Sequence, residues 1–421
     1  MGAVGLTCRE CRAEYPAEAR YVCERCFGPL EVTYEVDAGL DVAEHRRRIQ
    51  AGPQNLWRYS DFLPLDASPG PSSRTLSRTG LPAGCTPLIK ADRLAERLGL
   101  GEVWVKNDAA NPTHSFKDRV VAVAAARARE LGYEVLACAS TGNLANAVAA
   151  QGSALGMETY VFIPADLEEQ KILATGVYGT NLVKVRGSYD DVNRLCTELS
   201  GERDWAFVNV NVRPYYAEGS KTLAYEVAEQ LGWRVPDRLV VPIASGSLYT
   251  KIAKGFEEWL DLGLAEGTPP VMNGAQALGC SPVAGAWEAG HNVCKPVRPD
   301  TIAKSLAIGN PADGPYALDL ARSSNGSIDA VTDEELREGI RMLAETTGVF
   351  TETAGGVSTA TLAKLAERGD IDPDERVVLI ITGEGLKTLD AVRDTFDSFE
   401  IEPRVDAFIS EVEGVGAGAG R

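Results

Sequence analysis

Several features that define common protein classes are missing from this sequence. Its 421 residues contain no run of the roughly 18 apolar residues that a membrane helix needs. The start of the chain lacks the basic and then apolar pattern of a secretory signal. Positive charge is also scarce, because 42 Lys and Arg stand against 60 Asp and Glu, a net charge of -18. An acidic surface disfavours the binding of nucleic acid. Taken together, these absences lead us to expect a cytoplasmic protein without nucleic-acid or membrane partners.

Two phosphate-binding signatures are absent as well. The pattern GxxxxGK[ST] does not occur, and residues 217–222 (AEGSKT) imitate only its end, because Ser220 separates the glycine from the lysine. No GxGxxG follows the first expected strand. These absences argue against a P-loop nucleotide-binding protein and against a dinucleotide-binding fold.

Cysteine is too sparse for a disulfide scaffold, but four of the nine cysteines lie close together near the N-terminus. Cys8, Cys11, Cys23 and Cys26 form two CxxC pairs separated by 11 residues, which is the spacing of a zinc ribbon. Four thiolates suit a closed tetrahedral site, and so short a segment has little core of its own. We therefore expect a structural Zn²⁺. A redox pair or unused thiols are the alternatives.

Beyond this segment the chain alternates short apolar runs with helical patterns. Strands are expected at 102–107, 134–140, 158–164, 237–243, 271–278 and 376–382, and helices at 117–132, 144–156, 190–200, 219–231, 333–346 and 358–368. Such alternation predicts βαβ units and mostly parallel sheets. The segment 64–82, rich in Pro, Gly and Ser, predicts an extended connection, and the Gly-rich end predicts a disordered tail.

Lys117 is the first candidate for chemistry. It lies in NPTHSFKDR (111–119), between a loop and a helix that follow an expected strand. Ligands gather at the carboxyl ends of strands in doubly wound folds. A lysine in a confined site loses part of its solvation and can serve as a Schiff-base nucleophile. The alternative is an exposed lysine at a helix start.

Three later turns also follow strands. STGN (140–143) combines hydroxyls with a helix start, which suits a carboxylate, although it could be an ordinary N-cap. PIASGSL (242–248) offers small residues and a helix N-terminus to a phosphate. TGEGLK (382–387) places the Thr382 hydroxyl at a strand end, within reach of a planar ring or simply in a turn.

Together these segments resemble the fold-type II pyridoxal-phosphate-dependent enzymes, which are tryptophan synthase β-like, and within them the threonine synthase family. VNVNVRPYYAEGSKT (208–222) adds to the resemblance, and residues 6–34 resemble the zinc-ribbon-like leader of some members. The resemblance implies an α/β protein with two doubly wound, mostly parallel-sheet domains. We divide the chain into a zinc-ribbon-like unit (1–35), an extension and linker (36–84), a pyridoxal-phosphate-dependent catalytic region (85–400) with an inserted subdomain at about 120–218, and a tail (401–421).

The resemblance also assigns roles to residues. Lys117 is the expected catalytic residue and holds the cofactor covalently. The expected non-covalent cofactor contacts are Phe116 beside the ring, Asn143 at the ring hydroxyl, Thr382 at the pyridine nitrogen, and Ala244, Ser245, Gly246, Ser247 and Leu248 around the phosphate. This ASGSL loop departs from the Asn- and Gly-rich loop of many relatives. Ser140 and Thr141 are the expected ligands of the substrate carboxylate.

The implied reaction is the conversion of O-phospho-L-homoserine and water to L-threonine and phosphate. A second phosphate in so acidic a protein needs cations, for which we expect Arg213 and Lys221, with Lys387 a weaker candidate and structural ion pairing the alternative. His114 could assist proton transfer or only support the loop. Other possible functions are a threonine or serine dehydratase, a phosphoserine-using synthase such as cysteate synthase, and a non-catalytic zinc-ribbon interaction protein. The resemblance implies a homodimer.

Overall fold

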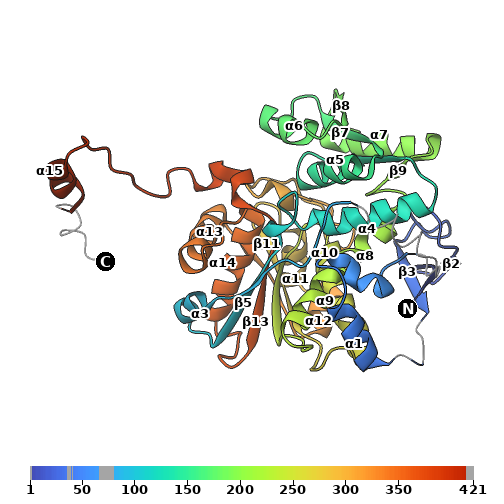
Figure 1. Cartoon of the computed structure of the whole chain (residues 1–421), viewed down its shortest axis with the longest axis horizontal. Coiled ribbons are helices and arrows are strands. Elements are labelled where there is room, and N and C mark those ends of the chain that lie inside the picture. The colour runs from blue at the N-terminus through green and yellow to red at the C-terminus, as the bar shows by residue number, and fades with distance from the viewer. Residues whose placement is uncertain (1, 36–38, 40, 66–79, 414–421) are drawn as a thin grey trace.

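The structure is a computed structural model that describes residues 2–35, 39, 41–65 and 80–413. It contains a three-stranded, a four-stranded and a six-stranded sheet (Figure 1). Most of the expected connection 64–82 and nearly all of the Gly-rich tail lie outside the described residues. Among the described helices, none has the length and apolar character needed to cross a membrane.

The six-stranded sheet has the strand order β12-β11-β10-β13-β5-β4. Neighbouring strands are parallel except for β4 and β5. The carboxyl ends of the parallel strands therefore meet at one edge, where ligands bind in such sheets. The strand bounds are β4 Leu88–Lys90, β5 Glu102–Asn107, β10 Arg238–Pro242, β11 Val271–Ala277, β12 Ile328–Val331 and β13 Arg376–Ile381.

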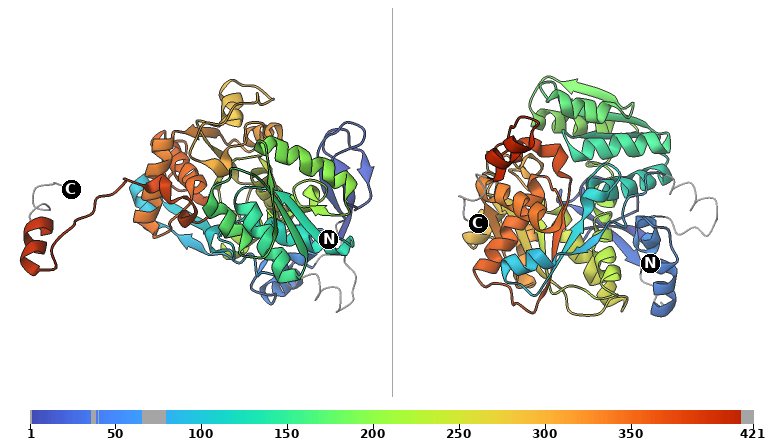
Figure 2. Two further views of the ribbon diagram at one scale, coloured as in Figure 1. Left: turned by 90° about the horizontal axis from the view of Figure 1, so that it is seen from above. Right: turned by 60° about the vertical axis from the view of Figure 1, so that its left-hand side comes forward.

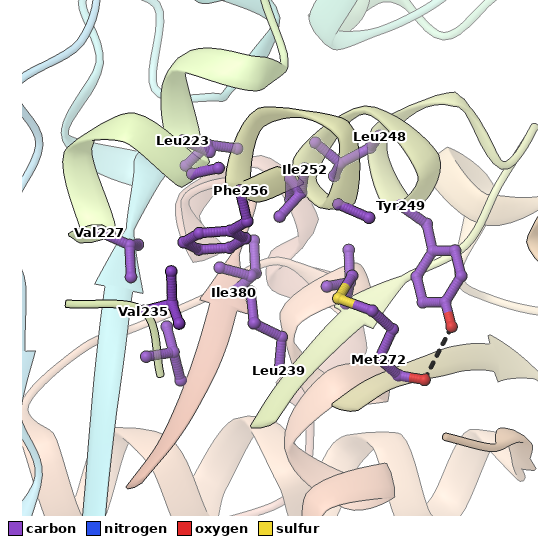
Figure 3. Close-up of a cluster of buried hydrophobic side chains, with 14 of the residues drawn as sticks. Leu223, Val227, Val235, Leu239, Leu248, Tyr249, Ile252, Phe256, Met272 and Ile380 are labelled. Carbon is purple, nitrogen blue, oxygen red and sulfur yellow. Dashed lines mark hydrogen bonds between the residues drawn. The ribbon is translucent and has the colours of Figure 1, made fainter. Parts of the chain in front are cut away.

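Helices cover both faces of this sheet because alternate residues of its strands point to opposite sides. Val378 and Ile380 pack in one core with α9 and α10, whereas Val377 and Leu379 pack in the other with α13 and α14. Figure 3 shows the first core, in which Ile380 lies near Phe256 of α10. One face carries α9 Lys221–Gln230, α10 Ser247–Asp261, α11 Pro282–Glu288 and α12 Gly314–Ser323, and the other α3 Asp92–Leu98, α13 Asp333–Thr347 and α14 Thr353–Glu367.

A smaller parallel sheet, in the order β8-β7-β6-β9, lies within the expected inserted subdomain and is green in Figure 1. Its core combines apolar residues of the strands with one face of α4 and α5. The elements are α4 Lys117–Glu130, β6 Val135–Ala139, α5 Asn143–Leu155, β7 Glu158–Pro164, α6 Glu169–Gly176, β8 Asn181–Val185, α7 Tyr189–Glu202 and β9 Ala206–Phe207.

The N-terminal leader is a three-stranded antiparallel sheet of β1 Gly2–Cys8, β2 Glu14–Tyr15 and β3 Leu30–Glu35. It does not have a core to itself. Leu6 and Val32 are buried in the same cluster as Val120 of α4 and Tyr215 of α8 Arg213–Glu218. The Tyr34 hydroxyl also donates to Glu218 at 2.8 Å. The leader is therefore packed onto α4 and α8.

The remaining elements connect or extend these layers. Beyond η4, the segment with α15 and η5 runs away from the body of the protein in Figure 1 and in the left view of Figure 2. This part of the expected tail therefore contains helical turns. The bounds are α1 Val42–Gln50, η1 Leu56–Phe62, η2 Asp108–Ala110, η3 Lys304–Leu306, η4 Gly385–Val392, α15 Val405–Phe408 and η5 Ile409–Glu413.

Two expected helices differ from the structure. The helix expected at 219–231 is α9, which begins at Lys221, and the short helix α8 that precedes it was not expected. Gly219 lies between them, where a Cβ atom would be 2.6 Å from the Val120 Cα atom, so the two chain segments approach closely. The helix expected from 358 begins at Thr353, because Gly355 and Gly356 belong to α14 rather than to a turn. A Cβ atom at Gly356 would lie 2.4 Å from the Leu336 oxygen of α13, so this glycine permits close helix packing.

Candidate active site

Lys117 is the first residue of α4 and lies beside the end of β13. Its Nζ atom donates a hydrogen bond to the Tyr216 hydroxyl at 2.9 Å and lies 4.5 Å from the centre of the Phe116 ring. The Phe116 amide donates to the Thr382 carbonyl at 2.9 Å, which ties the lysine segment to the sheet edge. The fold thus brings Phe116, Lys117 and Thr382 together, as the sequence predicts.

Asn143 is the first residue of α5 and lies near Thr382, since both side chains contact Glu352. Its Nδ2 atom donates to both carboxylate oxygens of Glu352, at 3.0 and 3.3 Å. Its Oδ1 atom accepts a hydrogen bond from Lys387 Nζ at 2.8 Å. The Thr382 hydroxyl lies 3.5 Å from the same carboxylate. Two residues expected at the cofactor ring therefore converge on one buried acid.

Glu352 is the functional candidate that sequence reasoning missed. It is the N-cap residue of α14 and is 4% exposed. Burial raises the pKa of its carboxyl group, whereas Asn143, Lys387 and Lys117 act in the opposite direction. A buried acid with a raised pKa near a candidate nucleophile is itself a candidate for the functional site. Its signal in the sequence is its place as an acid directly before the small residues 353–356.

The loop 242–248 has the shape of a phosphate cradle. Gly246 has φ +96°, and a Cβ atom there would lie 2.8 Å from the Asp313 carbonyl oxygen, so only glycine fits without strain. The Ser245 carbonyl accepts the Asp313 amide at 2.8 Å, which fixes the loop. The N-cap residue Gly246 has no side chain to cap α10, and the Ser247 amide makes only a 3.5 Å contact to Ser245 Oγ, so the helix start is suited to an anion. Leu248 is anchored in the adjoining apolar core (Figure 3).

The STGN turn has a similar open helix start. Ser140 is buried, Thr141 is half-buried, and the N-cap Gly142 makes no side-chain cap to α5. Ser140 Oγ is 3.4 Å from the Gly142 amide, so its hydroxyl faces the turn. Hydroxyls and backbone amides at this turn are suited to a carboxylate next to Asn143.

Arg213 lies one helical turn before Tyr216 on α8. It forms an ion pair with Asp313 at 2.7 Å, and Arg213, Ser247 and Asp313 line one small cavity. The structure therefore places this cation beside the loop 242–248. Its partner Asp313 already balances its charge, so an incoming phosphate has to compete with that carboxylate for the guanidinium.

Lys221 does not fit the substrate-phosphate role expected from the sequence. Its side chain is 0% exposed and forms ion pairs with Glu218 at 2.6 Å and Glu258 at 2.9 Å. Its Nζ atom also donates to the Phe62 carbonyl and lies 4.1 Å from the centre of the Tyr34 ring. Moving this ammonium group to a ligand would break both ion pairs inside the protein, which is costly for buried charges. The lysine instead joins α9, α10 and the leader.

A family model described as "Pyridoxal-phosphate dependent enzyme" matches residues 80–383. The chain belongs to this family. Among curated proteins it is 39% identical to a threonine synthase of Methanocaldococcus jannaschii, over 94% of this chain and 96% of the relative. It is 35% identical to a threonine synthase of Methanosarcina acetivorans, over 97% and 98% of the two chains. Within the pyridoxal-phosphate-dependent enzymes, these relatives identify it as a member of the threonine synthase family.

Solved structures of this enzyme family share the fold. A threonine deaminase of Solanum lycopersicum matches with a TM-score of 0.62 at 20% identity, covering 83% of this chain and 85% of that chain. A maize serine racemase matches with a TM-score of 0.60 at 20% identity, over 71% and 89%. These likenesses confirm the expected α/β fold class.

The four leader cysteines also come together. Their sulfur atoms all lie within 4.8 Å of one another, and the pairs Cys8–Cys26 and Cys11–Cys23 are 3.5 Å apart. A tetrahedral ion with metal–sulfur distances of about 2.3 Å requires sulfurs about 3.8 Å apart. The cluster therefore has the size of a tetrahedral thiolate site.

Proposed function

We propose that the protein is a threonine synthase, which converts O-phospho-L-homoserine and water to L-threonine and inorganic phosphate. The observation that carries this proposal is the similarity to threonine synthases along almost the whole length of both chains. The solved deaminase and racemase neighbours share the architecture at only 20% identity and support no particular substrate.

The site has the groups that pyridoxal phosphate needs. When bound, the cofactor withdraws electrons from the amino-acid substrate at the carbon that loses a proton. We propose Lys117 as its point of attachment and the turn at Gly246, with the start of α10, as its phosphate site. The other proposed cofactor contacts are Phe116, Asn143, Ala244, Ser245, Ser247, Leu248 and Thr382.

Lys117 is the proposed proton carrier. Its amine removes the proton from the substrate α-carbon and then transfers protons at Cβ and Cγ, while phosphate leaves from Cγ and water adds at Cβ. One amine with a pKa near the operating pH can act as base and acid in turn. The Tyr216 hydroxyl, 2.9 Å from Nζ, holds this amine on the α8 side of the site.

Two further groups of the substrate need partners. We propose that Ser140 and Thr141, with the open start of α5, bind its carboxylate. Arg213 is the proposed cation for the leaving phosphate, because it lies on the same helix face as Tyr216. A guanidinium suits this purpose because it can donate two parallel hydrogen bonds to a phosphate. Lys221 is not proposed as a phosphate ligand, because its buried ammonium group is paired with Glu218 and Glu258.

The remaining proposals concern assembly. We propose a structural Zn²⁺ at Cys8, Cys11, Cys23 and Cys26, on the size of the cluster and its closed set of four thiolates. A homodimer in the cytoplasm is proposed on the family resemblance alone, and sedimentation of the purified protein measures the dimer.

The test combines a chemical label with a substrate assay. Borohydride reduction of the yellow protein should fix the cofactor on Lys117, as peptide mapping reveals, and O-phosphohomoserine should release phosphate and threonine. Lys117→Ala should lose turnover by several orders of magnitude. The control Lys364→Ala, which removes a lysine paired with Glu335, should keep turnover. A label on another lysine, or faster turnover of serine or threonine, would contradict the proposal.

A further inference from the structure

Lys387 joins two loops of the active site. It lies in η4, just after β13, and is half-buried. Its Nζ atom donates to the Thr113 carbonyl at 2.6 Å and to Asn143 Oδ1 at 2.8 Å. Thr113 lies four residues before Lys117, so one ammonium group connects the lysine loop to the start of α5. The sequence had suggested this residue only as a weaker ligand for the substrate phosphate.

The two ends of the Asn143 amide have different partners. The oxygen faces Lys387, whose ammonium group can only donate hydrogen bonds. The nitrogen faces the two carboxylate oxygens of Glu352. Rotating the amide by 180° would place its nitrogen against the ammonium group and its oxygen against the carboxylate. Both contacts would then be repulsive, so this pair of neighbours fixes the orientation of the amide.

The charges around this amide also affect its strength as a donor. Burial lowers the pKa of Lys387, and the carboxylates of Glu352, Asp118 and Glu384 act in the opposite direction. A cation at the oxygen end polarises the amide, and hydrogen bonds in such a chain strengthen one another. The nitrogen of Asn143 is therefore a better donor than it would be beside a neutral residue.

We propose that Lys387 is a positioning residue of the cofactor site. By holding the Asn143 oxygen it leaves the amide nitrogen, which donates to Glu352 in this structure, as the end that can donate to the ring hydroxyl of pyridoxal phosphate. A ring oxygen that has lost its proton can only accept hydrogen bonds, so the amide oxygen in its place would repel it. The inference rests on the cofactor contacts proposed above. It gives Lys387 a function in the absence of any substrate.

The test measures cofactor binding without substrate. The purified enzyme is stripped of cofactor and titrated with pyridoxal phosphate, and the visible absorption band reports occupancy. We expect Lys387→Met to raise the dissociation constant about tenfold, the effect of losing one charge-assisted hydrogen bond. The pH at which the band changes should also rise, because a nearby positive charge is removed. Lys387→Arg, which keeps a charged donor, should retain most of the parental affinity for the cofactor. Lys364→Met should bind the cofactor as the parent does.

A double-mutant cycle separates positioning from a direct contact. If Lys387 acts through Asn143, Lys387→Met should have no further effect on the dissociation constant in an Asn143→Ala background. An equal loss of cofactor affinity in both backgrounds would overturn the proposal. So would a Lys387→Met variant whose absorption band and cofactor affinity match the parent and whose substrate KM alone is raised. Should Lys387→Met fail to fold, Lys387→Gln replaces it, with a smaller loss expected. A parent protein without any visible band would instead refute the cofactor assignment itself.

Discussion

The hydrogen bond between Lys117 and Tyr216 allows a test of the proposed proton carrier. Tyr216→Phe removes one hydroxyl and keeps the ring, which lies 5.6 Å from Lys117 Nζ. Hydrogen bonds to charged groups contribute about 1.5–3 kcal/mol, and both side chains are only half-buried, so the lower end applies. We therefore expect kcat/KM for O-phosphohomoserine to fall about tenfold, which corresponds to about 1.4 kcal/mol.

The adjacent residue provides a matched control. Tyr215 is fully buried, and its hydroxyl donates at 2.8 Å to the Glu18 carbonyl of the leader rather than to an active-site group. Tyr215→Phe should lower the melting temperature without a tenfold loss of kcat/KM. Steady-state kinetics and thermal melts of the two variants give the comparison. If Tyr216→Phe kept the parental kcat/KM, the hydroxyl would have no part in holding the Lys117 amine.

Three further variants test the structural assignments. Cys8→Ser should abolish zinc binding and also lower the stability of the whole protein, because Cys8 belongs to a core shared with α4. Metal analysis and thermal melts check this prediction, and a parent protein without zinc would contradict the metal site. Lys221→Met should leave the KM for O-phosphohomoserine within about threefold but cost stability, whereas a strongly raised KM would restore the phosphate role. Glu226→Gln should cost about 3 kcal/mol, because it leaves Lys106 without its carboxylate partner and Arg119 with Asp108 alone. These cations lower the pKa of Glu226 to about 2, so its stabilisation is complete above the ordinary value of 4.5 and is lost as pH falls toward 2; denaturant titrations of the variant should show a weaker acid dependence than the parent.

The sequence predicted most of the elements that are marked by apolar runs. The strand expected at 102–107 is β5, and the strand expected at 158–164 is β7, because both runs are bounded by polar turns. The apolar run 205–210 also predicts a strand, but only Ala206–Phe207 pairs as one. Local pattern shows that a segment is apolar, but the length of a strand depends on which neighbour is available.

The candidate site was predictable only where a residue followed a strand. Lys117, Asn143 and Thr382 met that condition, and the fold places them around one region. Glu352 did not, since it precedes a helix whose glycines resemble a turn. Lys221 shows the opposite error. We expected it to bind the substrate phosphate because the site needs a cation, but its charge is taken up by the carboxylates of Glu218 and Glu258. Ion partners from distant segments follow from tertiary packing, which local sequence does not contain.

The shared core of the leader affects the order in which the chain can fold during synthesis. Residues 2–35 leave the ribosome before α4 and α8, whose residues that cover Leu6 and Val32 are made roughly 90 to 210 residues later. The four thiolates lie within the first 26 residues and can take up metal long before that. Metal binding can therefore hold β1, β2 and β3 together while their apolar side still awaits its partner helices. An isolated 1–35 fragment would carry an uncovered apolar face and should be prone to aggregation.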